Sequence, residues 1–199
     1  MRVPENFLFY LSAHEDCSER LLLWARGFLA EDLEVSHDAE VMRLRKMVSS
    51  VQGEVHRMKA FVRLKALGPC VLYGYLKPRH KIGAYVCDHF ARRNPKVIIV
   101  LGNGSESWIS LCSDGKILRD HGGGIAEALE QLRSNLPCFD EGRDVGNIWR
   151  IYYDSQYCPK RKNMAAFRCR MPRRDLEAAG LRPVQNKNGV TLDDFFGKV

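Results

Sequence analysis

The sequence predicts an α+β domain on a largely antiparallel sheet of hairpins with several packed helices. Short apolar runs follow one another around turn residues between positions 61 and 119, which is typical of hairpins. Longer segments with helical periodicity lie before and after these runs. With 199 residues, 45% of them hydrophobic, the chain is long enough to form a core. We expect one domain over residues 1–180, followed by a linker and a flexible C-terminal tail over residues 181–199.

The first 60 residues are expected to form one strand and two helices. The apolar run at residues 5–11 is typical of a strand. Residues 15–31 carry apolar side chains at helical spacing, and so do residues 36–58, from Val41 to Met58.

The middle of the chain is expected to supply the sheet. Gly68-Pro69 separates β-like runs at 61–67 and 70–76, which predicts a hairpin. Three further strands are expected at residues 97–101, 108–112 and 116–119, and helices at 82–93, 125–135, 145–157, 163–169 and 175–179. Gly122-Gly-Gly124 precedes one of these helices, but no Lys-Ser/Thr follows it, so we expect a loop rather than a phosphate-binding turn.

Positive charge is concentrated in two blocks. The net charge is +7, and basic blocks at residues 56–100 and 146–187 alternate with acidic ones. If the two blocks meet in space, they form a face that attracts phosphates; otherwise they are two separately solvated faces. The side chains expected to bind nucleic acid are Arg57, Lys59, Arg63, Arg92, Arg93, Lys160, Arg161, Lys162, Asn163, Arg168, Arg170, Arg173 and Arg174.

Several classes of protein are not indicated. The seven cysteines are scattered without a Cys-x-x-Cys pair, so we expect reduced, mostly buried thiols and neither a metal nor a cofactor. No apolar run is long enough to cross a membrane, and the N-terminus is too short and too quickly acidic for a signal peptide. A cytoplasmic, nucleoid-associated protein is expected.

The candidates for catalysis are weak. His56 beside Glu54, or His80, would act as an acid or base, although a satisfied, partly buried histidine is the simpler interpretation. Asp88, the only acid between residues 56 and 100, is expected to pair on the helix surface with Arg92. Tyr152 lies among further aromatic and basic residues between Trp149 and Arg168, a mixture that binds single strands or extruded bases. We expect these rings to pack in the core along one helix, and we expect the basic side chains to bind nucleic acid.

The C-terminal segment carries an apolar cluster on a polar linker. In one helical turn Leu192, Phe195 and Phe196 lie together, and a short tail cannot bury them by itself. This cluster resembles the peptide by which replication and repair proteins bind the sliding clamp PCNA, which reads Gln-x-x-(Leu/Ile/Met)-x-x-aromatic-aromatic. Gly189 stands in the glutamine position, so this chain lacks one polar anchor of that peptide. The alternative is a tail that packs on its own domain.

The rest of the chain resembles a bacterial and archaeal family of DNA-repair or DNA-metabolism proteins without an assigned activity. The resemblance spans about residues 1–175 and is carried by the segments 54–63, 78–80 with 89–93, 148–155, 160–163 and 171–172. By match to the family's motifs, the positions expected to matter are His56, Arg57, Phe61, Arg63, His80, Phe90, Arg93, Tyr152, Arg161 and Asn163. Family members are encoded beside a radical-SAM protein or fused to a uracil-DNA-glycosylase-like domain, which this chain lacks. Because PCNA is an archaeal or eukaryotic clamp, an archaeal source is expected.

These resemblances imply a nucleic-acid-binding accessory protein in DNA repair. Its expected partners are DNA, the PCNA clamp and a partner enzyme of the radical-SAM class. Two alternatives stay open at this point: an enzyme that itself acts on DNA bases, and a module that binds RNA or protein with its tail docked on its own domain.

Overall fold

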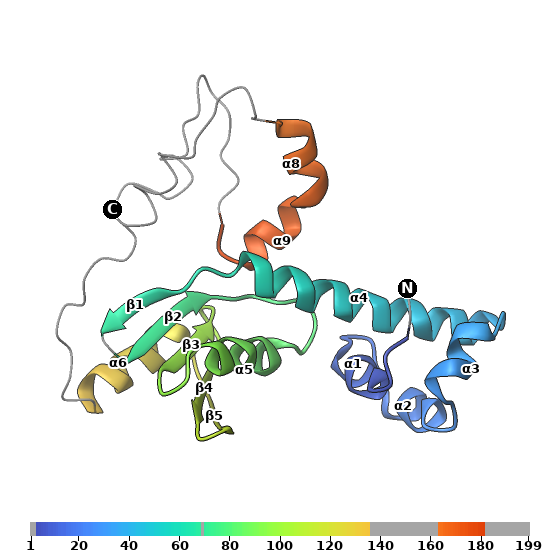
Figure 1. Cartoon of the computed structure of the whole chain (residues 1–199), viewed down its shortest axis with the longest axis horizontal. Helices are drawn as coiled ribbons and strands as arrows, with labels where there is room; N and C mark the ends of the chain where they lie inside the picture. The colour runs from blue at the N-terminus through green and yellow to red at the C-terminus, as the bar shows by residue number, and fades with distance from the viewer. Residues whose placement is uncertain (1–2, 69, 136–162, 182–199) are drawn as a thin grey trace.

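The computed structural model describes residues 3–68, 70–135 and 163–181, and over these ranges the chain has an α+β fold. A five-stranded sheet lies at one end of the molecule and a group of short helices at the other (Figure 1). One long helix, α4 (Ala39–Phe61), connects the two (Figure 1). The expected α+β class with a mostly antiparallel sheet is therefore confirmed.

The first element is a helix, α1 (Phe7–Ala13), so the prediction of a strand at residues 5–11 is wrong. Residues 7–11 are apolar without interruption, and such a run has no period that distinguishes a strand from a helix. Tertiary burial decides between them: Phe7 and Leu11, one helical turn apart, are both buried. Phe9, between them in sequence, is left on the outside with 40% of its surface exposed.

The helix expected at residues 15–31 is divided into α2 (Glu19–Ala25) and α3 (Ala30–Val35). The Ser18 hydroxyl caps the start of α2 by accepting a hydrogen bond from the Leu21 backbone N–H at 3.2 Å. Gly27 follows α2 and ends it, because glycine is a poor helix former. Both helices pack with α1 against the first half of α4.

Helix α4 matches the prediction for residues 36–58 and continues to Phe61. It begins where the Asp38 carboxylate accepts hydrogen bonds from the backbone N–H groups of Glu40 (2.7 Å) and Val41 (3.3 Å). Its apolar side chains serve two cores. Those from Val41 to Val48 pack with α1–α3, and those from Val51 to Val62 pack under the sheet.

The sheet has the strand order β1-β2-β3-β4-β5. The strands are β1 (Lys65–Gly68), β2 (Val71–Tyr75), β3 (Ile98–Gly102), β4 (Ser107–Ser113) and β5 (Lys116–Gly122). All neighbours are antiparallel except β2 and β3, which are parallel because α5 (Gly83–Arg93) connects them. The expected hairpins β1–β2, β3–β4 and β4–β5 are present. Asp114 and Gly115, both with positive φ, form the turn between β4 and β5.

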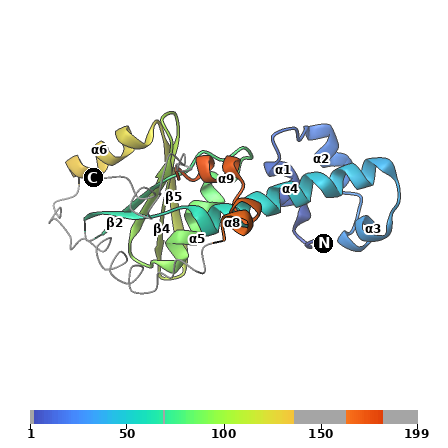
Figure 2. The same cartoon turned by 90° about the horizontal axis from the view of Figure 1, so that it is seen from above.

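Helices cover both faces of the sheet. Figure 2 shows the sheet between α5 and α6 (Ile125–Asn135). Alternate residues of β3 divide between the two faces: Ile99 and Leu101 pack with α5, and Val100 packs with Ala128 of α6. Both helices were expected from the sequence.

Two short helices, α8 (Met164–Arg170) and α9 (Arg173–Ala178), follow residue 162. They lie on the side of α4 opposite to α5 (Figure 1). Buried Leu176 and Ala179 hold α9 in place, and the Lys77 backbone N–H donates to the Ala178 carbonyl at 2.8 Å. The helix expected at residues 145–157 lies outside the described residues. Among the helices that the structure describes, none is long and apolar enough to cross a membrane.

Candidate nucleic-acid interface

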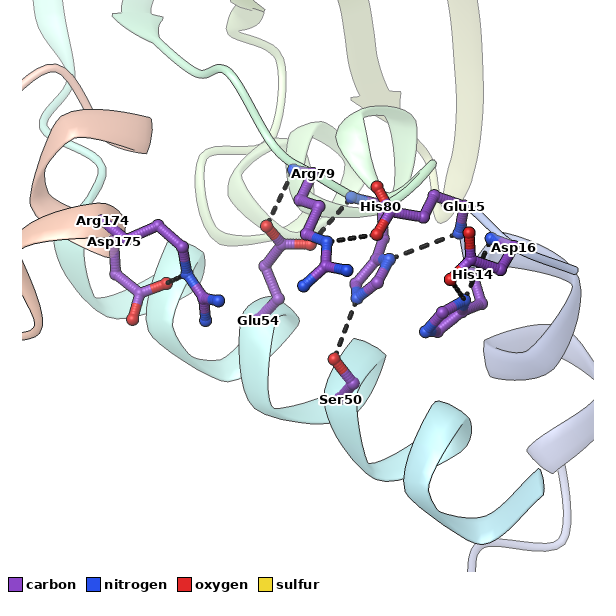
Figure 3. A network of polar contacts seen from close by, with 9 residues as sticks. All are labelled: His14, Glu15, Asp16, Ser50, Glu54, Arg79, His80, Arg174 and Asp175. Carbon is purple, nitrogen blue, oxygen red and sulfur yellow. Dashed lines mark hydrogen bonds and ion pairs between the residues drawn. The ribbon is translucent and has the colours of Figure 1, made fainter. Parts of the chain in front are cut away.

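The turn that leads into α5 is held by a buried carboxylate. Glu54 on α4 is 6% exposed, and its two carboxylate oxygens accept hydrogen bonds from the backbone N–H groups of Arg79 (2.8 Å) and His80 (3.0 Å) (Figure 3). Charge-assisted hydrogen bonds of this kind offset the cost of burying the carboxylate. Glu54 therefore positions residues 79 and 80.

His80 points from this turn toward α4 and has partners at both ring nitrogens. Its Nδ1 accepts from the Glu15 backbone N–H at 3.4 Å, which places the ring proton on Nε2 (Figure 3). Nε2 then donates to the Ser50 hydroxyl oxygen at 3.0 Å. His80 is 3% exposed, so neither nitrogen is open to a substrate. His80 acts as a connection between the two ends of the molecule.

Two neighbours complete this network. The His14 ring stacks on His80 with centroids 4.4 Å apart, and Arg79 pairs with the Glu15 carboxylate (Figure 3). Burial lowers the pKa of His80; the negative charge of Glu54 opposes this shift, and the other neighbouring charges have smaller effects. The neutral imidazole is the form that fits these hydrogen bonds.

A cavity of about 310 Å³ opens beside this turn. Its wall includes the charged side chains Arg79, Lys81 and Glu106, and the Trp108 ring. Gly83 lies so close to Trp108 that a Cβ there would be 2.2 Å from the ring. The walls of the cavity therefore combine charges of both signs with an aromatic surface.

His56 lies apart from this network. It is exposed on α4, two residues from Glu54, and this separation turns the two side chains about 200° apart on the helix. Glu54 is instead committed to the turn at residues 79–80. The expected Glu54–His56 proton pair is therefore not formed, and His56 is not the partly buried histidine that the sequence suggested.

Arg57 contacts a buried acid. Its Nε lies 2.6 Å from the Oδ2 of Asp175, and the Asp175 side chain is only 2% exposed. Arg174 lies farther from the same carboxylate, with 3.8 Å between its Nε and Oδ1 (Figure 3). Arg173 pairs one turn along α9 with Glu177 at 2.8 Å. On this side of α4, acids thus compensate three of the expected nucleic-acid-binding cations.

The cations on the α5 side have different surroundings. The ammonium of Lys59 lies 4.4 Å from the centroid of the Tyr85 ring. Arg92 and Arg93 are exposed in the last turn of α5. Within residues 3–68, 70–135 and 163–181, no carboxylate lies within ion-pair distance of these three side chains.

Arg63 and Asn163 have local backbone partners. The Arg63 guanidinium donates to the carbonyls of Ala60 (2.7 Å) and Phe61 (3.1 Å) at the end of α4. Asn163 caps α8, with its Oδ1 accepting from the Ala166 backbone N–H at 2.9 Å. Phe90 is buried in the core, and Arg170 is exposed at the end of α8, which also contains Arg168.

Asp88 forms a different ion pair from the expected one. Its carboxylate accepts hydrogen bonds from Arg119 of β5, at 2.6 and 2.9 Å to Oδ2, and from the Ser110 hydroxyl at 2.8 Å. The predicted surface pair with Arg92 is wrong, because Asp88 is 7% exposed and faces the sheet. The hydrogen bond to Asp88 raises the pKa of Arg119. This pair connects α5 to β4 and β5.

Among the described residues, the cysteines and the glycine turn have ordinary structural roles. Cys87 and Cys112 are buried, whereas Cys70 and Cys169 are exposed, so burial of the thiols is less general than expected. Burial raises the pKa of Cys87 to about 12, which makes this thiol unreactive. No His, Cys, Asp and Glu side chains in the described part gather in a group that could hold a metal.

The Gly124 backbone packs closely on the Gly104 carbonyl, as a tight loop requires.

Three groups of expected site residues lie outside the described residues. They are Tyr152 with its neighbouring rings, the basic residues Lys160, Arg161 and Lys162, and the tail residues Leu192, Phe195 and Phe196. Conversely, the roles of Glu54 and Asp175 could not be predicted from the sequence, because their partners lie far away along the chain. The exposure of Phe9 depends on the helical conformation of α1, whereas the sequence predicts a strand at residues 5–11.

Comparison with known proteins places the chain in a family. No curated protein and no solved structure matches it. A family model described as a domain of unknown function, DUF4130, matches residues 22–177, which include α4, the sheet, α5 and most of α9. The chain therefore belongs to the DUF4130 family, whose function is not known.

Proposed function

We propose that this protein binds nucleic acid as an accessory protein in DNA repair. The observation that carries this proposal is the positive charge of Lys59, Arg92 and Arg93 at the C-terminal ends of α4 and α5, which no acid in the described part of the chain compensates. Clustered cations without acidic partners attract the phosphate backbone and supply most non-specific affinity for DNA. The exposed Phe9 ring, which contacts the Tyr85 ring under Lys59, favours nucleic acid over an acidic protein.

The cations on the α9 side have a smaller part in this proposal. Because Arg57 and Arg173 already contact Asp175 and Glu177, a phosphate there would compete with an acid. The basic residues 160–162 lie outside the described residues, and their contribution to binding rests on the sequence alone.

Recruitment to DNA would come from the C-terminal tail. We propose that Leu192, Phe195 and Phe196 bind a PCNA-type sliding clamp, on the strength of their spacing. A tether of this kind raises the local concentration of the protein at DNA without new DNA contacts. An archaeal source and an association with the nucleoid would follow from such recruitment.

The chemistry of repair would then belong to a partner enzyme, for which the radical-SAM class is the candidate. The geometry does not favour catalysis by His80, because both of its ring nitrogens have partners within the protein. Exposed His56 makes no hydrogen bond within the described part of the chain. Turnover of damaged oligonucleotides by the purified protein, lost in His56→Ala, would reverse this assignment.

Salt dependence tests DNA binding. Fluorescence anisotropy with a labelled oligonucleotide, between about 50 and 200 mM salt, should show a steep loss of affinity. The double substitution R92Q/R93Q should lower the slope by about 2, whereas R173Q, which removes an arginine paired with Glu177, should change it little. A flat salt dependence of the wild type would exclude phosphate binding.

Calorimetry with an archaeal clamp tests recruitment. The wild type should bind and the double variant F195A/F196A should not, since each ring loses roughly 1.5–3 kcal/mol of burial. The variant G189Q restores the glutamine of the motif and should bind more tightly than the wild type. Equal affinity of the wild type and the double variant would remove the clamp from the proposal.

A further inference from the structure

A cluster of aromatic rings lies where α1 and α5 meet on the same side of α4. The Phe9 and Tyr85 rings have centroids 5.1 Å apart, and Tyr10 lies 5.3 Å from Phe9. Tyr10 and Tyr85 pack partly against the core, whereas 40% of the Phe9 surface is exposed. Phe9 is thus an aromatic ring held at the surface by two others.

Positive charge continues from this cluster along α5. Lys59 covers the Tyr85 ring, and the next turn of the helix presents His89, followed one turn later by Arg93. Burial lowers the pKa of His89, and the charges of Lys59 and Arg93 lower it further. We call the set Phe9, Tyr10, Lys59, Tyr85, His89 and Arg93 the aromatic–basic strip.

The strip is distinct from the other cationic side of α4. Arg57 and Lys59 are two residues apart and project about 200° from each other around the helix. The arginine faces buried Asp175, whereas the lysine faces an aromatic ring. Among the described residues, the strip therefore combines uncompensated charge with an exposed ring, and the α9 side does not.

We propose that the aromatic–basic strip binds single-stranded DNA, with an unpaired base stacked on Phe9 and the adjoining phosphates on Lys59 and Arg93. This inference rests on the proposed function and names its substrate class. In a duplex the faces of the bases are covered by their neighbours, so an exposed ring gains a stacking partner only from an unpaired base. Lys59, on α4, lies over the Tyr85 ring, and Arg93 lies about two turns farther along α5, so the two cations lead away from Phe9 as the backbone beside a stacked base requires.

The test compares single-stranded and duplex DNA of the same length by anisotropy. F9A should weaken single-strand binding by roughly 5- to 150-fold and leave duplex binding unchanged, because stacking is lost and phosphate contacts remain. F9L keeps an apolar side chain against Tyr85 without an aromatic face, and it should lose most of the same affinity. W24A, at another exposed ring on α2, is the matched control and should bind like the wild type.

Photocrosslinking locates the base independently of variant stability. A single strand carrying 5-iodouracil should crosslink to Phe9 or Tyr85, as identified by mass spectrometry of the peptides. Absence of crosslinks to α1 and α5, or an equal loss of affinity in F9A and W24A, would overturn the inference.

The two proposals fail in different ways. If the wild type binds both DNA forms with a steep salt dependence and F9A binds like the wild type, the strip does not stack bases and only this inference falls. If the wild type binds neither form, the proposed function falls with it.

Discussion

Arg57 and Asp175 form an ion pair whose partners differ in access to water. The Asp175 side chain is 2% exposed and that of Arg57 is 28% exposed. Removing the arginine leaves a buried carboxylate, with only the more distant Arg174 nearby. Removing the acid leaves a guanidinium that still reaches solvent.

This asymmetry predicts that removing the arginine lowers the free energy of unfolding more than removing the acid does. R57M should lower the free energy of unfolding by about 2–3 kcal/mol, and D175N by about 1–2 kcal/mol. The double variant R57M/D175L should regain part of the loss, since no charge is then buried alone. Urea denaturation measures all three, and R173A serves as the control, because its exposed pair contributes at most about 1 kcal/mol. Equal costs for the two single variants would contradict this view of the pair.

His80 makes stability depend on pH. Its pKa is lowered in the folded protein, so below about pH 6.5 the unfolded chain binds more protons than the folded one. Stability is therefore present above that pH and is lost as the pH falls. Between about pH 7.5 and 5.5 we expect the free energy of unfolding to decline, and to decline less steeply in H80Q. H56Q removes an exposed imidazole and should keep the wild-type slope; an unchanged slope in H80Q would argue against this role for His80.

At the scale of elements, the position of α5 depends on the contact between Gly83 and Trp108. An added Cβ would lie 2.2 Å from the ring, and Trp108 is itself packed in the core with 9% exposure. G83A should therefore destabilise the protein by about 1–3 kcal/mol, despite the better helix propensity of alanine. G104A is the matched control, because nothing lies within 4 Å of its new Cβ. Thermal unfolding should show a clear drop for the first variant and almost none for the second.

The elements also show what sequence patterns can and cannot predict. Helix α4 was predicted because a single apolar period runs from Val41 to Met58. Helix α1 was missed because its apolar run has no period, and only contacts of Phe7 and Leu11 with distant residues decide its conformation. The hairpins followed from their turn residues, whereas the parallel pairing of β2 and β3 follows from the position of α5. Long-range partners such as Asp88 with Arg119 leave no local signal.

At the scale of the molecule, α9 is part of the fold rather than an appendage. It supplies buried Leu176 and Ala179 and the acid that pairs with Arg57. A chain shortened to residues 1–181 should retain the stability of the described fold, and one shortened to 1–171 should lose roughly 3 kcal/mol or more. Chemical denaturation of the two fragments tests this. Equal stability would mean that α9 only rests on α4.

The candidate site was only partly predictable at this scale. The basic blocks were evident from composition. The cations of the first block nevertheless lie on two sides of α4, because Arg57 and Lys59 project in different directions around the helix. Phe9 is part of the aromatic–basic strip because α1 folds as a helix against α4. This conformation places the Phe9 ring beside Tyr85, which lies 76 residues later in the sequence.

Helix α4 also fixes how the two ends of the molecule are set relative to each other. Its 23 residues span roughly 35 Å as one rigid rod, with one core near each end. One residue inserted between Val48 and Val51 would turn one end against the other by about 100°, which would separate Phe9 from Tyr85 and Glu15 from His80. A working relative with a longer α4 would have to add about seven residues, two full turns, and would then need a different way to bring its rings together.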